Sequence, residues 1–368
     1  MQLLVITTAG RIVTGESSVH AADLLLGLTL NDDWYVIQRL PAIGDRTGST
    51  FSVGYLVKNS SGVNAFCKAL DYSSAFEADD PAEELHSLAA SYLFERDLLQ
   101  RCGSRRMSRI VRALDSGQVR VAGAQLPVVN FLIFELADAD SRDIIESADK
   151  ADCLTALKLA HDCAVALAQL HRSNITHQDV KPANVLGWKD QDARWSGKLG
   201  DLGRAFCEDM DSPHANISCP GDTNWAPPEL LYNPSSLPFR TLAARQLADV
   251  YGLGSLLCYF LTGVPYTGIL AMYLAKQHHW MSWPGGYEEA KAYLADAHED
   301  ALRRLADNLH IEVKDHVIPL IDDMCNPDLL RRGQQVGKSH QTLNMLERYI
   351  ARLNLTHHRI RVGRTAVG

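Results

Sequence analysis

The stretch from residue 177 to residue 184 constrains this chain more than any other feature of its sequence. It contains an acid, Asp179, then a basic residue, Lys181, and an amide, Asn184, and a second acid, Asp201, follows later in the chain. A carboxylate can accept a proton from a hydroxyl group, an ammonium group can neutralise a phosphoryl group, and an amide oxygen can bind magnesium. Phosphoryl transfer needs positioning and charge neutralisation more than covalent chemistry. The stretch therefore predicts a phosphoryl-transfer site.

One Asp-x-Lys-x-x-Asn pattern is weak evidence by itself, because any loop rich in these residue types can produce it. A solvated surface loop would be the simpler interpretation of the pattern alone. The interpretation as a site gains weight because other residues that phosphoryl transfer uses precede and follow it in a fixed order.

Length and composition limit the class of protein. The 368 residues are enough for two lobes, and the hydrophobic fraction of 46% is that of an ordinary globular protein. The net charge of −8 argues against a general nucleic-acid binder. The eight cysteines form no Cys-x-x-Cys pair, which is typical of reduced thiols in the cytosol. We expect a cytoplasmic protein with no nucleic-acid partner.

The sequence also gives no sign of a targeting or membrane segment. The first residues lack the basic region of a signal peptide, and no stretch reaches the roughly 18 apolar residues of a membrane helix. We expect one catalytic unit with no membrane partner and no receptor or sensor domain.

The first third of the chain has the pattern of β-structure. A strand-like run lies at residues 34–37, and the run at residues 44–57 carries three glycines. Glycines let backbone N–H groups approach phosphates, but Gly44, Gly48 and Gly54 are spaced more loosely than a Gly-x-Gly-x-x-Gly loop. A plain hairpin is the alternative interpretation.

A lysine and a glutamate in this region are candidate partners. Lys68 lies inside the apolar run at residues 65–70, where an ammonium group needs an anionic partner. Glu95 lies on a helix predicted over residues 82–102 from the spacing of its leucines. The alternatives are an edge-strand lysine that faces water and a glutamate on a solvated helix face.

Two further strands are predicted at residues 109–113 and 128–136. The second is almost continuously apolar, so it should be buried. Pattern and polarity change directly after it, and we place a lobe boundary after Ala137.

The pattern becomes helical beyond this boundary. An apolar stripe predicts a buried helix over residues 154–170, and a hairpin over residues 185–199 should bring Asp201 back to the first motif. Residues 247–257 are apolar on every side except at Asp249, which predicts a central buried helix. A single carboxylate in such a helix must be hydrogen-bonded.

With these residues in order, the sequence resembles eukaryotic-type protein kinases, and its layout resembles their bacterial members. The resemblance implies an α+β, bilobal protein-kinase-like fold, with a small β-rich N-lobe at residues 34–137 and a larger helical C-lobe at residues 138–350. An N-terminal extension at residues 1–33 and a basic C-terminal tail at residues 351–368 would flank the lobes. We expect the tail to be solvated and frayed.

The resemblance assigns roles to individual residues. Asp179 matches the catalytic base, and Lys181 matches the residue that holds the γ-phosphate. Asn184 and Asp201 match the magnesium ligands. The cofactor-binding residues implied for ATP are Lys68, Glu95, Gly48, Glu135, Ala137 and Asp201, with Phe134 as the gatekeeper before the hinge.

Two later motifs complete the resemblance. Glu229, in Trp-Ala-Pro-Pro-Glu, matches the glutamate of the A-P-E motif, and Arg331 or Arg332 would be its late arginine partner. Asp249 matches the buried aspartate of the central helix.

The chain also departs from the family pattern. Gln178 replaces an arginine that clamps a phosphate on the activation segment, so we expect activity without that phosphorylation. Asp222 stands where serine/threonine kinases carry a threonine, and Leu202 replaces a phenylalanine, a change that packing tolerates. Cys207 and Cys219 both lie in the activation segment, the stretch from Asp201 to Glu229 that shows no periodicity. We favour two unrelated thiols over a disulfide, because cytosolic disulfides are rare.

The favoured prediction is an ATP- and magnesium-dependent serine/threonine protein kinase that acts on a protein substrate. A small-molecule kinase of the aminoglycoside-phosphotransferase type is one alternative, but such enzymes lack an A-P-E segment. A nucleotide-binding pseudokinase scaffold is another. The residues whose loss would indicate a pseudokinase are all present: Lys68, Asp179, Asn184 and Asp201. The substrate protein and the oligomeric state are not indicated.

Overall fold

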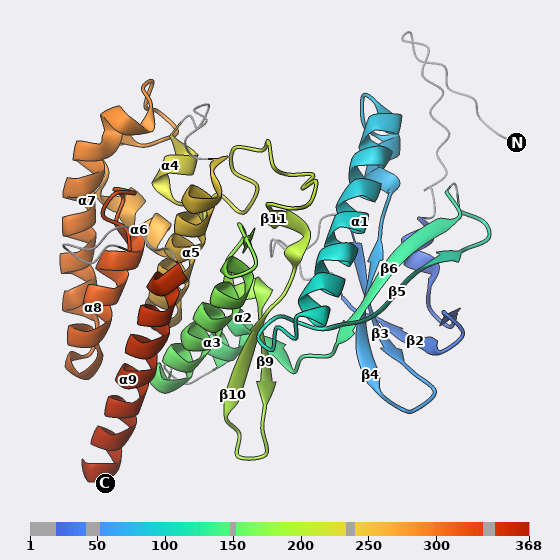
Figure 1. Cartoon of the computed structure of the whole chain (residues 1–368), viewed down its shortest axis with the longest axis horizontal. Coiled ribbons are helices and arrows are strands. Elements are labelled where there is room, and N and C mark those ends of the chain that lie inside the picture. Colours follow the sequence, from blue (N-terminus) through green and yellow to red (C-terminus); the bar gives the residue numbers. More distant parts are fainter. Residues whose placement is uncertain are drawn as a thin grey trace, which may run out of the picture. The chain divides into compact units, whose positions relative to one another are not determined.

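The computed structural model describes residues 20–41, 52–124, 126–147, 152–232, 240–333 and 343–367. The chain forms two compact units, of which the first comprises residues 1–88 and 114–134 and the second residues 89–113 and 135–368. The first unit is rich in strands and the second is rich in helices (Figure 1). The α+β class predicted from the sequence is confirmed.

A six-stranded sheet is the main structure of the first unit. Its strands are β1 (Thr29–Leu30), β2 (Trp34–Arg39), β3 (Ser52–Lys58), β4 (Asn64–Leu70), β5 (Ala113–Arg120) and β6 (Val128–Glu135). Their order in the sheet is β1-β2-β3-β4-β6-β5. Strand β4 shows the alternation of a half-buried strand, because Ala65, Cys67 and Ala69 are fully buried and the residues between them point to the opposite face.

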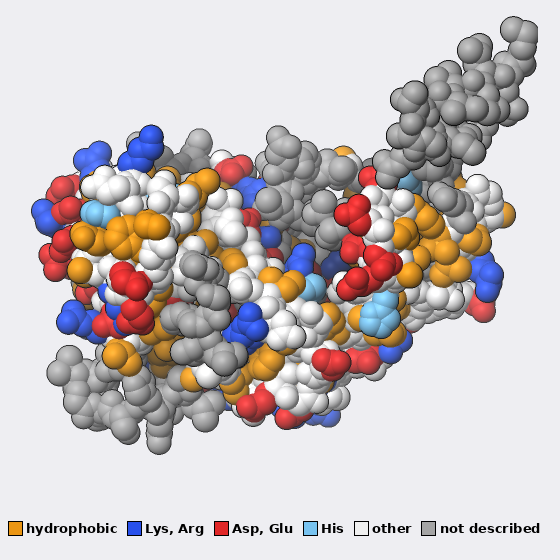
Figure 2. Space-filling model, turned by 90° about the horizontal axis from the view of Figure 1, so that it is seen from above, with side chains coloured by type: hydrophobic (Ala, Val, Ile, Leu, Met, Phe, Trp, Pro, Cys, Tyr) orange, Lys and Arg blue, Asp and Glu red, His pale blue; other side chains and the backbone are white. Residues whose placement is uncertain are grey.

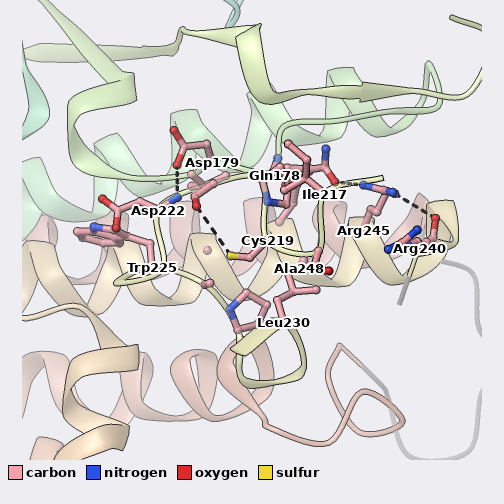
Figure 3. A pocket seen from close by; sticks show the side chains of 18 residues that line it. Gln178, Asp179, Ile217, Cys219, Asp222, Trp225, Leu230, Arg240, Arg245 and Ala248 are labelled. Atoms are coloured by element: carbon pink, nitrogen blue, oxygen red, sulfur yellow. Dashed lines mark hydrogen bonds between the residues drawn. The ribbon is translucent and has the colours of Figure 1, made fainter. Parts of the chain in front are cut away.

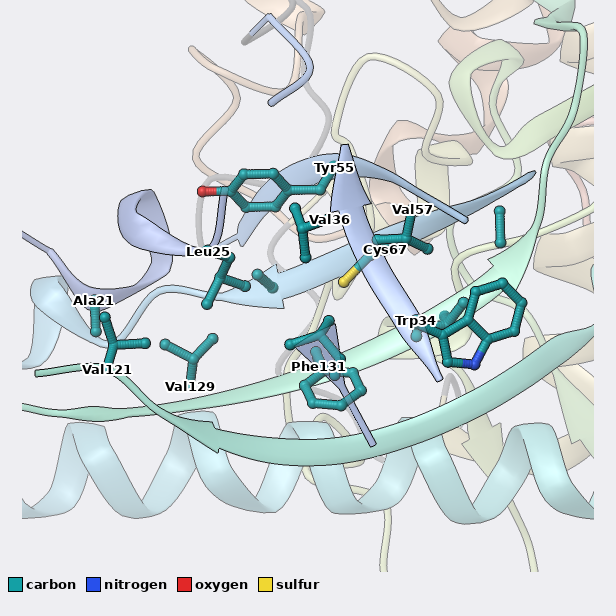
Figure 4. Close-up of a cluster of buried hydrophobic side chains, with 14 residues drawn as sticks. Ala21, Leu25, Trp34, Val36, Tyr55, Val57, Cys67, Val121, Val129 and Phe131 are labelled. Carbon is teal, nitrogen blue, oxygen red and sulfur yellow. The ribbon is translucent and has the colours of Figure 1, made fainter. Parts of the chain in front are cut away.

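The core of the first unit is a cluster of apolar side chains around this sheet (Figure 4). The chain before β2 takes part in it, since Leu25 is fully buried there and the hydroxyl of Tyr55 donates a 2.6 Å hydrogen bond to the carbonyl oxygen of Ala22. This part includes the 3-10 helix η1 (Ala21–Leu24). The boundary predicted at residue 33 falls inside the sheet, where β1 pairs with β2.

Helix α1 (Pro81–Ser104) confirms the helix predicted at residues 82–102. The carboxylate of Asp80 accepts hydrogen bonds from the backbone N–H groups of Ala82 and Glu83, at 3.1 and 3.0 Å, and caps its first turn. The short 3-10 helix η2 (Ser73–Phe76) precedes it.

The strand predicted at residues 109–113 is wrong, because β5 begins only at Ala113. The backbone N–H of Val111 donates to the carbonyl oxygen of Leu199 (2.9 Å), and the N–H of Leu199 donates to Arg109 (2.8 Å). These residues form a connector held by a segment distant in sequence, which local alternation does not reveal. The strand predicted at residues 128–136 is confirmed by β6.

Helices make up most of the second unit. They are α2 (Ser141–Ser147), α3 (Cys153–His171), α4 (Pro228–Leu231), α5 (Leu242–Thr262), α6 (Tyr266–Tyr273), α7 (Tyr287–Asn308), α8 (Ile311–Cys325) and α9 (Leu343–Val367). The short strands are β7 (Ala139–Asp140), β8 (Ile175–Thr176), β9 (Val185–Lys189), β10 (Trp195–Leu199) and β11 (Phe206–Cys207). They form a sheet in the order β10-β9-β7 and a separate pair of β8 with β11. The 3-10 helices are η3 (Pro182–Asn184), η4 (Leu202–Arg204) and η6 (Lys276–His278).

Helix α3 is a core helix of this unit. It packs against α5, α9 and β10, and Asp152 caps it by accepting a hydrogen bond from the N–H of Leu154 (3.3 Å). By length and composition α3 is apolar enough to cross a membrane, so the expectation that no stretch reaches this size is wrong. However, 67% of its apolar stretch is buried within the fold, as in a core helix. Among the described residues, α5 and α6 pass the same test only as a bent pair.

The segment at residues 351–367 is not a frayed tail. Up to Val367 it continues helix α9, which packs against α3. Leu353, Thr356 and Ile360 are buried at helical spacing, whereas Arg359 is exposed. The prediction gave weight to the basic residues and overlooked the apolar face between them.

The surface of the second unit mixes charges of both signs on the face drawn in Figure 2. On α7, Lys291 pairs with Glu288 at 2.7 Å, and Arg303 pairs with Asp300. Such exposed pairs contribute less than about 1 kcal/mol each, so the buried core rather than these pairs stabilises the unit.

Candidate active site

A buried carboxylate on α5 supports the loop of residues 177–184. Asp249 is 1% exposed and accepts hydrogen bonds from the backbone N–H groups of His177 and Gln178, both at 2.8 Å. The ring Nε2 of His171 is its third partner, at 2.9 Å. The prediction that this lone acid must be hydrogen-bonded is confirmed. Because Asp249 binds backbone groups, it fixes the loop and leaves the polar side chains of the loop available.

The ring of His177 connects the loop to the next motif. Its Nε2 lies 2.9 Å from the carbonyl oxygen of Gly200, and its Nδ1 lies 3.2 Å from the backbone nitrogen of Asp179. A carbonyl oxygen only accepts and a backbone N–H only donates, so this neutral ring carries its proton on Nε2. The buried ring therefore holds Gly200, and with it Asp201, beside the loop.

The carboxylate of Asp179 lies at the centre of a hydrogen-bonded cluster. Its Oδ2 is 2.9 Å from the Nζ of Lys181 and 3.1 Å from the Nδ2 of Asn184. Its Oδ1 accepts a 2.9 Å hydrogen bond from the backbone N–H of Asp222 (Figure 3). The fold thus brings the three predicted catalytic residues within hydrogen-bond distance and fixes the orientation of the carboxylate.

Asn184 has one side-chain atom suited to a cation. Its Nδ2 donates to the backbone carbonyl of Asp179 (2.7 Å) as well as to the carboxylate, so the amide oxygen is the atom that can take a metal ion. The carbonyl oxygen of Asn184 accepts a 2.8 Å hydrogen bond from the N–H of Gly200. This bond places Asp201 next to Asn184, as the predicted hairpin required.

Two carboxylates converge near Gly203. A Cβ atom at this glycine would lie 3.4 Å from the Oδ1 of Asp201 and 3.5 Å from the Oε2 of Glu95. Asp201 has a left-handed backbone with φ of 55° at the start of η4. Magnesium prefers oxygen ligands and needs only one or two from protein when phosphates supply others, so Asn184 and Asp201 fit this ion. Among the described residues, no group of three or more His, Cys, Asp or Glu side chains could hold a metal.

Lys68 is half-buried and Glu95 is buried, so neither occupies the solvated position of its alternative interpretation. Lys68 is on β4, which lies between β3 and β6, so the edge-strand alternative is wrong. It is opposite Gly54 in the register, on the face away from the buried Cys67. Glu95 is 5% exposed, so the solvated-face alternative is also wrong. The pairing of Lys68 with Glu95 would join the two units and stays a prediction.

Glu229 at the start of α4 forms a buried ion pair with Arg332. The Nη1 and Nη2 of Arg332 donate to the two carboxylate oxygens at 2.6 and 2.8 Å, and neither residue is more than 2% exposed. Of the two arginines predicted as partners, Arg332 is therefore the right one. Arg331 is exposed and lies 3.8 Å from Asp328.

A comparison with known protein families identifies the family of this chain. Residues 42–336 match the protein kinase domain. The chain belongs to the protein kinase domain family. The resemblance inferred from the order of the motifs is confirmed.

Several serine/threonine-protein kinases are similar to part of this chain. The serine/threonine-protein kinase PknB of Mycobacterium tuberculosis (strain ATCC 25177 / H37Ra) is 29% identical over 191 residues, which cover 51% of this chain and 28% of that protein. PknB of Mycolicibacterium smegmatis shows the same identity and coverage. The serine/threonine-protein kinase DCLK1 of Rattus norvegicus is 34% identical over 107 residues, 29% of this chain and 24% of that protein. The chain thus spans less than a third of the length of these relatives.

In this kinase domain the predicted hinge follows β6. The carboxylate of Glu135 accepts hydrogen bonds from the Nζ of Lys198 (2.6 and 2.7 Å) and from the backbone N–H of Arg112 (2.8 Å). Its side chain is therefore committed to the fold, and its backbone N–H is committed as well, because it donates to the carbonyl oxygen of Arg112 (3.1 Å). Gly48, in the predicted glycine loop, lies outside the described residues.

The activation segment of the kinase domain passes very close to the catalytic loop, which comprises residues 177–184. A Cβ at Gly221 would lie only 2.3 Å from the backbone oxygen of Gln178 and 3.0 Å from the carboxylate of Asp179, so only glycine fits here. Asp222 binds Asp179 through its backbone, while its carboxylate accepts from the N–H of Asn224 (3.0 Å). Sequence reasoning missed Gly221, although the Pro-Gly-Asp turn around it was a usable signal.

A pocket lies between this segment and α5 (Figure 3). It is lined by Asp179 from the catalytic loop, Trp225 from the segment, Leu230 from α4 and Arg245 from α5. Cys219 also lines it, and burial raises the pKa of this thiol to about 11. The polar side chain of Asp179 thus stands at one side of a partly apolar hollow.

The two cysteines of the segment are separate free thiols. Cys207 is buried, and its sulfur accepts a 3.4 Å hydrogen bond from the Nη1 of Arg101 on α1, which also pairs with Asp209 at 2.6 Å. Cys219 is half-buried in the pocket. The structure contains no Cys207–Cys219 disulfide, in agreement with the favoured prediction.

Proposed function

We propose that this chain transfers the γ-phosphate of ATP to serine or threonine hydroxyls of a protein substrate. The observation that carries the proposal is the arrangement of Asp179, Lys181 and Asn184 in one cluster, with Asp201 adjoining it. A surface loop that merely contained these residue types would not orient them on one another. The family match and the printed names of the relatives, which are serine/threonine-protein kinases, support the same reaction class.

In this proposal each polar residue of the catalytic loop has a separate role in phosphoryl transfer. Asp179 orients the substrate hydroxyl and accepts its proton, since its carboxylate is fixed but remains a hydrogen-bond acceptor. Lys181 stands 2.9 Å from that carboxylate and is placed to neutralise the transferring group. Asn184 and Asp201 would hold magnesium, which when bound neutralises charge on the phosphate oxygens.

The nucleotide-binding residues complete the proposal. Lys68 would hold the α- and β-phosphates with Glu95 as its partner, and Gly48 would belong to the loop over the phosphates. The backbone of Glu135 and Ala137 would receive the adenine. A lysine on a central strand and a buried helix glutamate support these roles, because each needs an opposite charge nearby.

The proposal is tested by transfer of labelled γ-phosphate from ATP. The purified chain is incubated with magnesium, alone and with a generic basic protein substrate, beside the Asp179→Asn variant. We expect label on protein with wild type and a loss of about 10²–10⁴-fold in the variant, the usual contribution of a catalytic acid or base. Circular dichroism should show that the variant keeps the fold, because the substitution keeps the size of the side chain.

The position of the label decides the hydroxyl specificity. Mapping of labelled residues to serine and threonine supports the proposal, whereas labelled tyrosine contradicts it. Nucleotide binding without any labelled protein would indicate a small-molecule kinase or a pseudokinase instead. Equal transfer by the Asp179→Asn variant would overturn the assignment of the base.

A further inference from the structure

Arg245, near the start of α5, reaches the activation segment and the catalytic loop with one guanidinium group. Its Nη2 donates to the carbonyl oxygen of Ala215 (2.6 Å), and its Nη1 donates to the side-chain oxygen of Gln178 (Figure 3). Its Nε donates to the carbonyl oxygen of Arg240 (3.0 Å). The group also lies over the ring of Phe206, with its Cζ 4.4 Å from the ring centroid.

The amide nitrogen of Gln178 also binds the activation segment. Its Nε2 donates a 2.9 Å hydrogen bond to the carbonyl oxygen of Arg204, near the beginning of the segment. The segment is thus held at Arg204 by Gln178 and at Ala215 by Arg245, and the two holding groups bond to each other. Loss of either side chain removes one attachment and weakens the other.

The acceptors of Arg245 are all neutral oxygen atoms. Within the ranges that the structure describes, no carboxylate lies within ion-pair distance of Arg204, Arg240 or Arg245. Burial, followed by the nearby charge of Arg240, lowers the pKa of Arg245, but a guanidinium group stays charged in proteins. The contacts therefore require no negative group on the segment.

We propose that the Gln178–Arg245 contact replaces a phosphate clamp and positions the activation segment for the protein substrate, with Arg245 as a positioning residue. This inference rests on the proposed kinase function and goes beyond it. The replaced arginine of the catalytic loop would bind a phosphate on the segment, whereas here an arginine from α5 binds the segment backbone directly. The segment beyond Ala215 lines the pocket beside Asp179, so its position sets substrate binding rather than nucleotide binding.

The test exchanges the two side chains on protein shown to be phosphate-free by intact mass. Arg245→Gln should raise the KM for a protein substrate at least about tenfold, the loss expected for a charge-assisted hydrogen bond, with the KM for ATP unchanged. Gln178→Arg should also raise the KM for the protein substrate, because it brings two positively charged guanidinium groups into contact. The double variant Q178R/R245Q restores one arginine and one glutamine at the contact, so its KM should return towards wild type.

Hydrogen exchange of residues 205–216 gives a second readout that needs no catalysis. Both single variants should lose protection there, and the double variant should regain it. Arg245→Lys keeps the charge but lacks the planar fork of three nitrogen atoms that reaches three separate acceptors, so it should resemble Arg245→Gln. Arg240→Gln is the matched control, because it removes a neighbouring charge but none of the three hydrogen bonds of Arg245, and its exchange should match wild type.

Three results would overturn the inference. The first is a double variant that recovers neither the KM for the protein substrate nor the exchange protection of residues 205–216. The second is a loss of this protection in Arg240→Gln as large as in Arg245→Gln. The third is that these residues of phosphate-free wild type become protected only after phosphorylation. If wild type labels no protein at all, the proposed function fails, but the exchange measurements still decide whether the Gln178–Arg245 contact holds the segment.

Discussion

Two buried carboxylates of the second unit hold neighbouring loops, and their charges are balanced in different ways. Asp249 accepts two backbone N–H groups and the ring of His171, whereas Glu229 faces the full positive charge of Arg332. The charge of Asp249 is stabilised by several hydrogen bonds, each of which contributes a part. The charge of Glu229 depends mainly on one partner, and loss of Arg332 would leave this carboxylate buried without a counter-charge.

The difference has consequences for what each carboxylate controls. Asp249 binds the residues directly before Asp179, so it sets the position of the catalytic loop. Glu229 connects α4, at the end of the activation segment, to the chain after α8, and Arg332 adds a 2.9 Å hydrogen bond to the carbonyl oxygen of Asn326. We therefore expect loss of the ion pair to affect mainly stability, and loss of Asp249 to affect stability and turnover together.

The largest stability effect is expected for Arg332→Met. The variant leaves the buried carboxylate of Glu229 without its counter-charge and should lose about 3–5 kcal/mol of unfolding free energy. Urea unfolding monitored by circular dichroism measures the loss. The double variant Glu229→Gln/Arg332→Met removes both charges and should recover part of it, because a buried pair replaced by neutral groups often costs little. A double variant less stable than the single variant would contradict this account.

A smaller effect is expected for Asp249→Asn. The amide replaces one carboxylate oxygen with a donor, so one of the backbone N–H groups of His177 and Gln178 loses its acceptor, at a cost of about 1–3 kcal/mol. Turnover should fall as well, because these N–H groups fix the backbone that carries Asp179. Urea unfolding and the kcat of phosphate transfer are the measurements.

Asp162→Asn is the matched control for this variant. Asp162 is also fully buried, but it binds Lys158 (2.6 Å) and the backbone N–H of Gly197 (2.9 Å), away from the catalytic loop. It should lose stability while its kcat stays near that of wild type. An equal fall of kcat in both variants would show that Asp249 acts only through stability.

The sequence predicted the parts of the site that lie within a short stretch. Asp179, Lys181 and Asn184 are close along the chain, so the loop that contains them also brings them together in space. Asp249 was recognisable because a lone acid stands out in an apolar helix. Local pattern and spacing are sufficient evidence for features of this kind.

The partners supplied by distant segments could not be predicted in the same way. Arg245 precedes the apolar run of α5 and looks like a solvated residue, yet its acceptors are on the activation segment and the catalytic loop. The connector at residues 109–113 has a strand-like pattern, but its hydrogen bonds include ones to the distant residues Leu199 and Glu135. Tertiary contacts override local preference at these places, and only the folded structure reveals them.

His214, in the activation segment, shows a third way of handling charge, because it stays neutral. Its Nδ1 lies 3.2 Å from the Nη1 of Arg204, and its Nε2 lies 3.5 Å from the hydroxyl of Ser91 on α1. Burial, followed by the charge of Arg204, lowers the pKa of His214 from 6.5 to about 4. The neutral ring can accept from the guanidinium group, whereas a protonated ring would repel it.

This pKa shift predicts the smallest effect, a dependence of stability on pH. Between pH 6.5 and about 4 the unfolded chain binds a proton at His214 that the folded chain does not, so stability falls as the pH decreases through this window. Above pH 6.5 both states are neutral and the contribution is constant. The slope of unfolding free energy against pH should be shallower in His214→Gln, whose amide can still accept from Arg204 without titrating. Urea unfolding at pH 7 and at pH 5 measures this slope, and equal slopes in the two proteins would assign the acid sensitivity of the fold to other groups.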